Sequence, residues 1–165
     1  MITLNGIGAS PGTAEGALFC YHRQEYAGPP RPVGSAEQEL ERFRAALRQA
    51  DAQLRQLFRD TVSDADESVA QVFEIHRMML EDKDYLEKVE RLITQSGKGV
   101  EAAVEEAARI FSETFLAMDS AYMQARSADV LDVSTRLLHI LRGEEEKPLT
   151  LPFPVILAEI GRAHV

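Results

Sequence analysis

Few side chains in this sequence have the types and spacing that could do chemistry. The four histidines are His22, His76, His139 and His164, and no pair has the spacing of metal ligands. No Ser-His-Asp or Cys-His arrangement is recognisable, and no two carboxylates are placed as an acid–base pair. The one cysteine, Cys20, excludes an internal disulfide, and we expect it to be a small buried residue of a strand. These residues predict no catalytic centre and no metal site.

The segment around His76 carries the most distinctive polar residue. On a helix, His76 shares a face with Phe73 and with Met79 or Leu80. Two interpretations follow, and the residues do not decide between them. His76 is either a half-buried structural histidine or a histidine at an interface with another protein.

Two adjacent methionines, Met78 and Met79, follow in the same segment. Methionine adapts to a partner surface, but a methionine stripe on a helix is more often part of the core. Acidic side chains around such an apolar centre would steer a basic partner towards it. The neighbouring acids are Glu74, Glu81, Asp82 and Asp84.

A long helical block must position these residues. Ser35 and Gln38 fit a capping box, in which each side chain bonds the other residue's backbone N–H. Apolar residues then recur at alternating spacings of three and four, which predicts a helix with one apolar face. Further helices should follow, up to Arg142, with breaks near Asp64, Asp82, 97–99 and Asp119. The block therefore predicts an antiparallel bundle of two helical hairpins.

Both ends of the chain have the pattern of strands. Short apolar runs at Ile2–Leu4 and Ala17–Tyr21 flank a glycine-rich run, and another occurs at Pro154–Ala158. The glycine spacing fits neither a dinucleotide fingerprint nor a phosphate-binding loop, so turns are expected there. The fold class is therefore mainly α, a bundle inserted in a truncated α/β domain. The expected segments are 1–24 (first strands), 25–34 (linker), 35–143 (bundle), 144–159 (return to the α/β part) and 160–165 (tail).

Charge and hydropathy exclude some classes of function. The net charge is −9, from 18 basic and 27 acidic side chains, which disfavours binding to nucleic acid. No stretch is long and apolar enough to span a membrane, and no signal peptide is visible. The sequence predicts a cytoplasmic protein without a nucleic-acid or membrane partner.

Three segments together resemble enzyme I of the bacterial phosphoenolpyruvate:sugar phosphotransferase system. They are Gly6–Ala17 (GIGASPGTAEGA), Glu74–Asp82 (EIHRMMLED) and Arg126–Leu138 (RSADVLDVSTRLL), in the family's order and spacing. The resemblance extends from about Leu4 to about Ala158. It implies a phosphoenolpyruvate–protein phosphotransferase, which moves a phosphoryl group from phosphoenolpyruvate to a histidine and then to the carrier HPr.

The resemblance also implies a site and its partner. A helical subdomain would dock HPr, inserted into the α/β subdomain that carries the phosphohistidine. No cofactor is expected in this chain. Magnesium and phosphoenolpyruvate would bind only to a C-terminal domain of the parent family. This sequence differs from the family pattern at Ser68 and Lys83, because acidic residues are common at these two positions in the family. The residues it places at the HPr face are Glu67, Glu74, His76, Met78, Met79, Asp82, Asp84 and Arg126.

The family's phosphohistidine motif, Gly-Gly-x-Thr-Ser-His, has no counterpart in this sequence. Gly161–His164 echoes it faintly, but lacks the Thr-Ser pair and comes too early. We interpret residues 160–165 as a non-native tail on an N-terminal fragment. Two alternatives are a nitrogen-related or multidomain paralogue, and a helical interaction module without phosphotransfer.

The missing motif predicts that the purified chain does not accept phosphate from phosphoenolpyruvate. Incubation with labelled phosphoenolpyruvate and magnesium, followed by mass spectrometry, measures this. Stable phosphate on His164 or His76 would contradict the interpretation.

Overall fold

The computed structural model describes residues 12–13, 15–21, 31–64, 67–144 and 153–159. The chain divides into two compact units. One contains the strands β1, Ala17–Tyr21, and β2, Val155–Glu159. The other, Arg31–Glu146, is helical. The boundaries of the segments expected from the sequence remain predictions.

The predicted helical block is confirmed over the described residues. Its helices end near the breaks that the sequence predicts: α1 ends at Asp64, and the later breaks fall at Glu81 and Asp82, at 97–99 and at 117–120. The helices are α1 (Ala36–Asp64), α2 (Glu67–Leu80), α3 (Lys83–Ser96), α4 (Val100–Leu116) and α5 (Ala121–Arg142).

Local hydrogen bonds explain where several of these helices begin. The capping box of α1 is present, because the Ser35 N–H donates to Gln38 Oε1 at 2.9 Å and the Gln38 N–H to Ser35 Oγ at 3.3 Å. Asp82 caps α3 by accepting from the Tyr85 N–H at 2.9 Å. Ser120 occupies the cap position of α5, but its side chain makes no capping bond.

Glycines end two helices in the left-handed conformation. Gly97 has φ 62° after α3 and Gly143 has φ 70° after α5. A side chain is strained in that region, so glycine is the favoured residue. The Gly143 N–H donates to the Ile140 carbonyl at 3.0 Å, which satisfies one carbonyl of the last turn.

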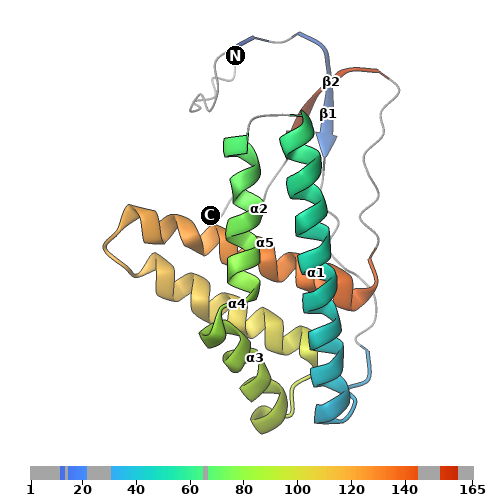
Figure 1. Cartoon of the computed structure of the whole chain (residues 1–165), viewed down its shortest axis with the longest axis vertical. Helices are drawn as coiled ribbons and strands as arrows, with labels where there is room; N and C mark the ends of the chain where they lie inside the picture. Colours follow the sequence, from blue (N-terminus) through green and yellow to red (C-terminus); the bar gives the residue numbers. More distant parts are fainter. Residues whose placement is uncertain (1–11, 14, 22–30, 65–66, 145–152, 160–165) are drawn as a thin grey trace, which may run out of the picture. The chain divides into compact units, whose positions relative to one another are not determined.

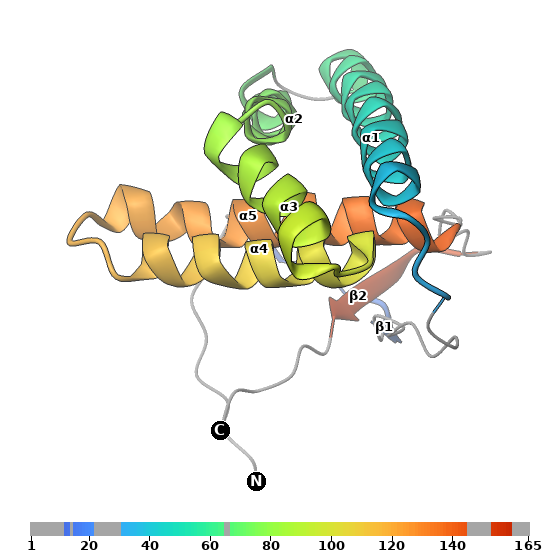
Figure 2. The same cartoon turned by 90° about the horizontal axis from the view of Figure 1, so that it is seen from below.

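The helices pack as two layers. Figures 1 and 2 show α1 antiparallel to α2, with α3 continuing from α2 at an angle, and the α4–α5 hairpin crossing this layer. Small alanines in the shared core allow close helix approach. The core residues are Phe43, Ala46, Ala50 and Leu54 from α1, Leu80 from α2, Tyr85, Val89, Leu92 and Ile93 from α3, Val100, Ala103, Val104, Ala107 and Ala108 from α4, and Val130, Val133, Leu137 and Leu141 from α5.

The strand unit joins segments from the two ends of the chain. Strands β1 and β2 pair in parallel, with Ala17 opposite Val155 and Tyr21 opposite Glu159. A parallel pair needs a long connection, and the helical residues supply it. Cys20 is exposed, so its predicted burial is wrong: within the described residues β1 has one neighbouring strand and no covering layer. The predicted strand 2–4 and most of the glycine-rich run lie outside the described residues.

A buried carboxylate, Glu39, connects three segments of the helical unit. The residue is 2% exposed. Its oxygens accept from the Gly34 N–H at 3.0 Å, the Val100 N–H at 2.9 Å and Arg42 Nη1 at 2.9 Å. Arg42 also donates to Glu101. Burial by itself would raise the pKa of Glu39, but the bonds from Val100, Gly34 and Arg42 more than offset it and hold that pKa below its usual value.

We expect Glu39→Gln to lower the free energy of unfolding by roughly 1–3 kcal/mol at neutral pH. The amide nitrogen of the new glutamine side chain would face the N–H group of Gly34 or Val100, which needs an acceptor. Because the folded pKa is depressed, the stabilisation is present above the unfolded pKa of about 4.3 and is lost as the pH falls through the folded value. Urea denaturation at several pH values should show the two proteins converging below about pH 4.

Glu41→Gln is the matched control, since Glu41 lies exposed on the same helix and pairs with exposed Arg48. Its effect should stay within about 0.5 kcal/mol. An equal loss in both variants would show that Glu39 is not the connecting residue.

Candidate interaction surface

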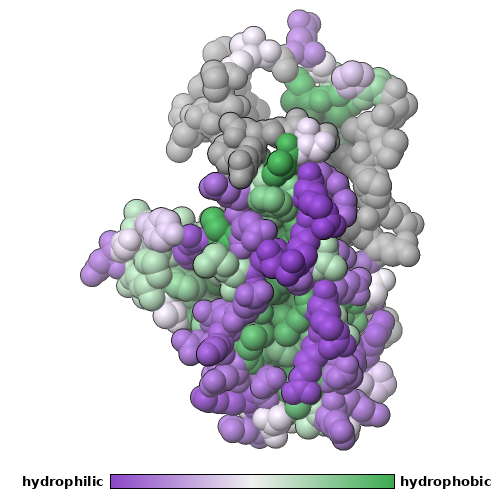
Figure 3. Space-filling view, in the orientation of Figure 1, coloured by the Kyte–Doolittle hydropathy of each residue, from purple (hydrophilic) through white to green (hydrophobic). Residues whose placement is uncertain are grey.

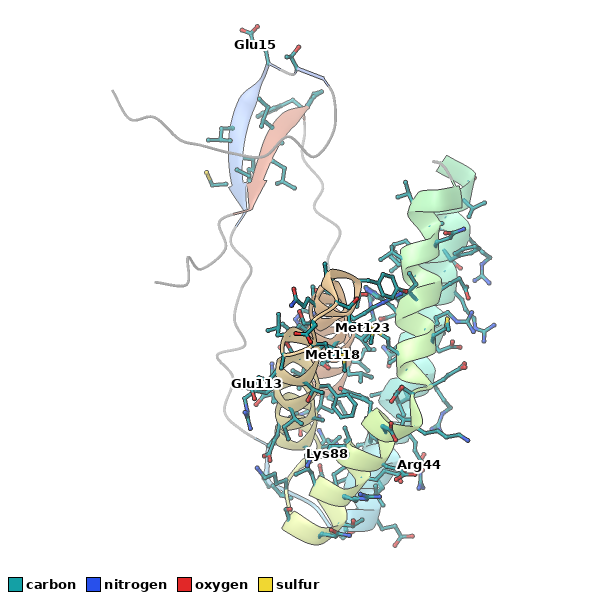
Figure 4. All side chains as sticks on the ribbon, turned by 90° about the vertical axis from the view of Figure 1, so that its left-hand side faces the viewer. Glu15, Arg44, Lys88, Glu113, Met118 and Met123 are labelled. Atoms are coloured by element: carbon teal, nitrogen blue, oxygen red, sulfur yellow. The ribbon has the colours of Figure 1, made fainter. Side chains whose placement is uncertain are left out.

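An apolar groove of about 250 Å³ lies where the end of α2 and the start of α3 meet the α4–α5 hairpin. Met118 lines the groove, and Met123 belongs to the first turn of α5; Figure 4 labels both on the hairpin. The walls are mostly apolar, and two carboxylates stand among them. The lining residues are Met79, Asp82, Asp84, Tyr85, Phe111, Thr114, Phe115, Met118, Val130 and Val133.

Tyr85 forms a rigid part of this groove. Its hydroxyl is hydrogen-bonded to Ser134 Oγ at 2.7 Å, and its ring meets Phe111 edge to face at 5.5 Å. Both contacts join α3 to the hairpin. Burial raises the pKa of Tyr85 to about 12, and the bond to Ser134 offsets this only in part. The groove therefore has a wall with a fixed, neutral phenol.

The two methionines lie in different surroundings. Met79 is half-buried against the core and lines the groove. Met78 is 71% exposed, because consecutive helical residues point about 100° apart. The core interpretation therefore holds in part for Met79 and fails for Met78.

An ion-pair network fixes the opposite side of α2. Arg77 donates from Nε to Asp51 on α1 at 2.7 Å and from Nη1 to Glu74 at 2.8 Å. The bond to Asp51, with that to Glu74, raises the pKa of Arg77. The predicted site residue Glu74 is thus engaged in holding α2 to α1.

A second polar contact joins α2 to α5. His76 is 8% exposed, and its Nε2 lies 3.6 Å from Asp129 Oδ1. Asp129 Oδ2 accepts from Arg126 Nη1 at 3.2 Å, and Arg126 also donates to the Tyr122 hydroxyl. The bond to Tyr122 is the first cause of a raised Arg126 pKa. His76 is a buried residue that contacts the surface cluster through Asp129.

The structure therefore brings together only some of the predicted site residues. Met79, Asp82 and Asp84 share the groove, and His76 and Arg126 meet through Asp129 beside Val130. Met78 and Glu74 lie elsewhere on α2, and the side chain of Glu67 lies outside the described residues. Sequence reasoning missed the groove residues from α4, α5 and the turn between them, because the apolar periodicity of these helices indicates only a core face. These residues are Phe111, Thr114, Phe115, Met118, Val130 and Val133.

The surface has apolar and charged regions. Figure 3 shows pale and green apolar atoms on the projecting end of the α4–α5 hairpin, and mostly hydrophilic side chains over α1 and α2. At this end Leu116 is 56% and Tyr122 66% exposed. Exposed apolar groups beside acids are typical of a protein interaction surface.

The described residues provide no metal site and no membrane span. No group of three or more His, Cys, Asp or Glu among them could hold a metal ion, so we assign no magnesium ligand to them. Within the same residues, no helix is sufficiently long and apolar to cross a bilayer.

Comparison with known proteins identifies the family. Residues 5–126 match the family described as PEP-utilising enzyme, N-terminal. The chain belongs to this family. The resemblance drawn from its three sequence segments is thus confirmed.

Curated relatives are similar along almost the whole chain. A phosphoenolpyruvate–protein phosphotransferase of Latilactobacillus sakei is 32% identical over 160 residues, which cover 96% of this chain and 27% of the relative. The chain thus spans about a quarter of the length of such members of the PEP-utilising enzyme family.

Solved structures share the fold. A solution NMR structure of an Enzyme I protein has a TM-score of 0.72 at 21% identity, covering 90% of this chain and 61% of that one. The N-terminal domain of the protein named Enzyme 1 - Nitrogen has a TM-score of 0.63 at 23% identity, covering 78% and 56%. The predicted fold class, a helical bundle inserted between short strands, is confirmed.

Tyr85 makes the stability of the groove sensitive to alkaline pH. A folded pKa above the unfolded value of about 10 stabilises the fold below pH 10, and this contribution is lost as the pH rises towards 12. As the pH rises through this range, the free energy of unfolding of wild type should fall by roughly 2–3 kcal/mol because of Tyr85. Tyr85→Phe should not show this decrease. Denaturation from about pH 8 to 11.5 measures it.

Tyr122→Phe is the control, because Tyr122 is exposed and lies outside the groove lining. It should keep the alkaline loss of wild type. The same pH profile for Tyr85→Phe and wild type would contradict the role assigned to burial.

Proposed function

We propose that this chain docks the phosphocarrier HPr, as the N-terminal part of a phosphoenolpyruvate–protein phosphotransferase. Its family membership and the name of its curated relatives support the proposal. The observation that carries it is the apolar groove with carboxylates in its wall.

The chemistry of the groove suits the partner that the family resemblance implies. HPr's docking face in that family is apolar and basic. Met79, Phe115 and Met118 offer adaptable apolar contact, while Asp82 and Asp84 supply negative charge beside it. Rim charges of this kind act chiefly on the association rate, and the apolar centre supplies most of the affinity.

In this proposal the chain positions HPr and does not itself carry the phosphoryl group. The group would pass from phosphoenolpyruvate to a histidine of the parent protein that this sequence does not contain, and then in line to HPr. His76 is unsuited to be that acceptor, since its Nε2 is buried against Asp129. Holding two reactants in line supplies much of the rate of such transfers. We place the reaction in the cytoplasm.

Met78→Ala and Met79→Ala test the docking surface. Met78 is exposed, so its truncation should leave stability unchanged, and a loss of affinity then reports contact with HPr. Met79 lines the groove, and we expect its loss to weaken binding at least about fivefold. Calorimetric or NMR titration of HPr against each folded variant measures this. Raising the salt from about 0.05 M to about 0.5 M should weaken binding moderately.

Leu131→Ala and Glu41→Ala are matched controls. Leu131 is an exposed apolar residue of α5 outside the groove lining, and Glu41 is an exposed acid of α1. Both should bind HPr like wild type. If Met79→Ala binds as well as these controls, the methionine belongs to the core and the proposed surface is wrong.

A further inference from the structure

His76 is placed where a protein rarely leaves a polar atom. Its Nε2 is buried and makes no hydrogen bond within the described part of the chain. A carboxylate oxygen, Asp129 Oδ1 on α5, lies 3.6 Å away, too far for a hydrogen bond. A neutral imidazole gains little from this arrangement. A protonated imidazole carries an N–H at both nitrogens and a positive charge, which the nearby carboxylate attracts.

Asp129 has two oxygens with different surroundings. Oδ2 accepts from Arg126 Nη1 at 3.2 Å, whereas Oδ1 faces His76. Arg126 has a second partner, the hydroxyl of exposed Tyr122. The Asp129 carboxylate therefore lies between the buried imidazole of His76 and the guanidinium of Arg126. Arg126 can keep its hydrogen bond to Tyr122 if it loses the one to Asp129.

We propose that His76 is a positioning residue, and that its protonation controls Arg126 through Asp129. When the imidazole is neutral, Asp129 serves Arg126 alone. When it is protonated, the carboxylate is shared, α2 is drawn to α5, and Arg126 shifts its contact towards Tyr122 at the surface. Histidine is the side chain that ordinarily changes charge between about pH 5 and 8, so a series of measurements across that range tests the switch.

Other charged groups lie near α2. On α2 itself, Arg77 is held by Asp51 of α1 and by Glu74. The elements packed against α2 are α1, α3 and α5. Asp129 of α5 faces His76 and pairs with Arg126, while Asp82 and Asp84 lie at the junction of α2 and α3 in the groove lining. Further along α5, Arg136 donates to Gln53 of α1.

This switch lies beside the proposed docking groove, and its effect on docking rests on the proposed function. Val130, next to Asp129 in sequence, lines the groove with Met79 of α2. Protonation of His76 would add positive charge beside the acidic groove and would displace the guanidinium of Arg126. A basic partner should then bind more weakly at pH 6 than at pH 8, by roughly two- to fivefold.

NMR of the full chain tests the proposal without any partner. The side-chain signals of Arg126 and the carboxyl carbon of Asp129 are followed from about pH 5 to 8. In wild type both should move in one step that coincides with the titration of the His76 ring. In His76→Gln the Arg126 step should vanish, and Asp129→Asn should abolish it by removing the intermediary. His139→Gln, which removes a histidine of α5 beside Glu144, should retain it.

The outcomes separate the two proposals. An Arg126 signal that does not move in wild type, or that still moves in both His76→Gln and Asp129→Asn, overturns the switch whatever HPr does. A step that depends on His76, in a chain that does not bind HPr at either pH, supports the switch and contradicts the docking function. A step that depends on His76, together with weaker HPr binding at pH 6 only when His76 is present, supports both.

Discussion

The Glu39 carboxylate is the constraint on which the helical unit depends. It is nearly inaccessible to water, and it accepts bonds from Gly34, two residues before α1, from the first residue of α4 and from Arg42. Arg42 then reaches Glu101 on α4 and the Leu141 carbonyl near the end of α5. One side chain thus sets the start of two helices and, through its arginine, the end of a third. Removing the Glu39 carboxylate would leave the Gly34 and Val100 N–H groups without this acceptor, which is costly.

With that end held, polar contacts on two sides determine the orientation of α2. Arg77 joins it to α1 through Asp51, and His76 faces Asp129 of α5. The two contacts differ in kind. The Arg77 guanidinium donates to Asp51 at 2.7 Å, whereas His76 Nε2 lies 3.6 Å from Asp129 Oδ1 and makes no hydrogen bond within the described residues. The side of α2 that faces α1 is therefore held more firmly than the side that faces α5.

The groove results from this geometry. Its lining comes from α2, α3, α4, α5 and two of the connections between them. The buried Tyr85–Ser134 bond keeps α3 against α5. Apolar side chains remain open to solvent there because the end of α2 and the projecting α4–α5 hairpin cover each other only partly. Docking would then need little rearrangement, which favours rapid exchange of a small carrier. The strand unit, by contrast, exposes Leu18 and Leu157, although parallel strands are normally covered on both faces.

The sequence by itself determined the helices, their breaks and most of their caps, because these depend on periodicity and on residues within one turn, such as Ser35 with Gln38 and Gly143 after α5. It also indicated the family, since three motifs kept their order and spacing. It could not distinguish Met78 from Met79, nor the two interpretations of His76, because rotation of α2 about its axis depends on partners 25 to 55 residues away, such as Asp51 and Asp129. Only the tertiary structure placed Phe111, Phe115 and Val133 around Met79, since a groove between helices arises from their crossing and has no periodic signal of its own.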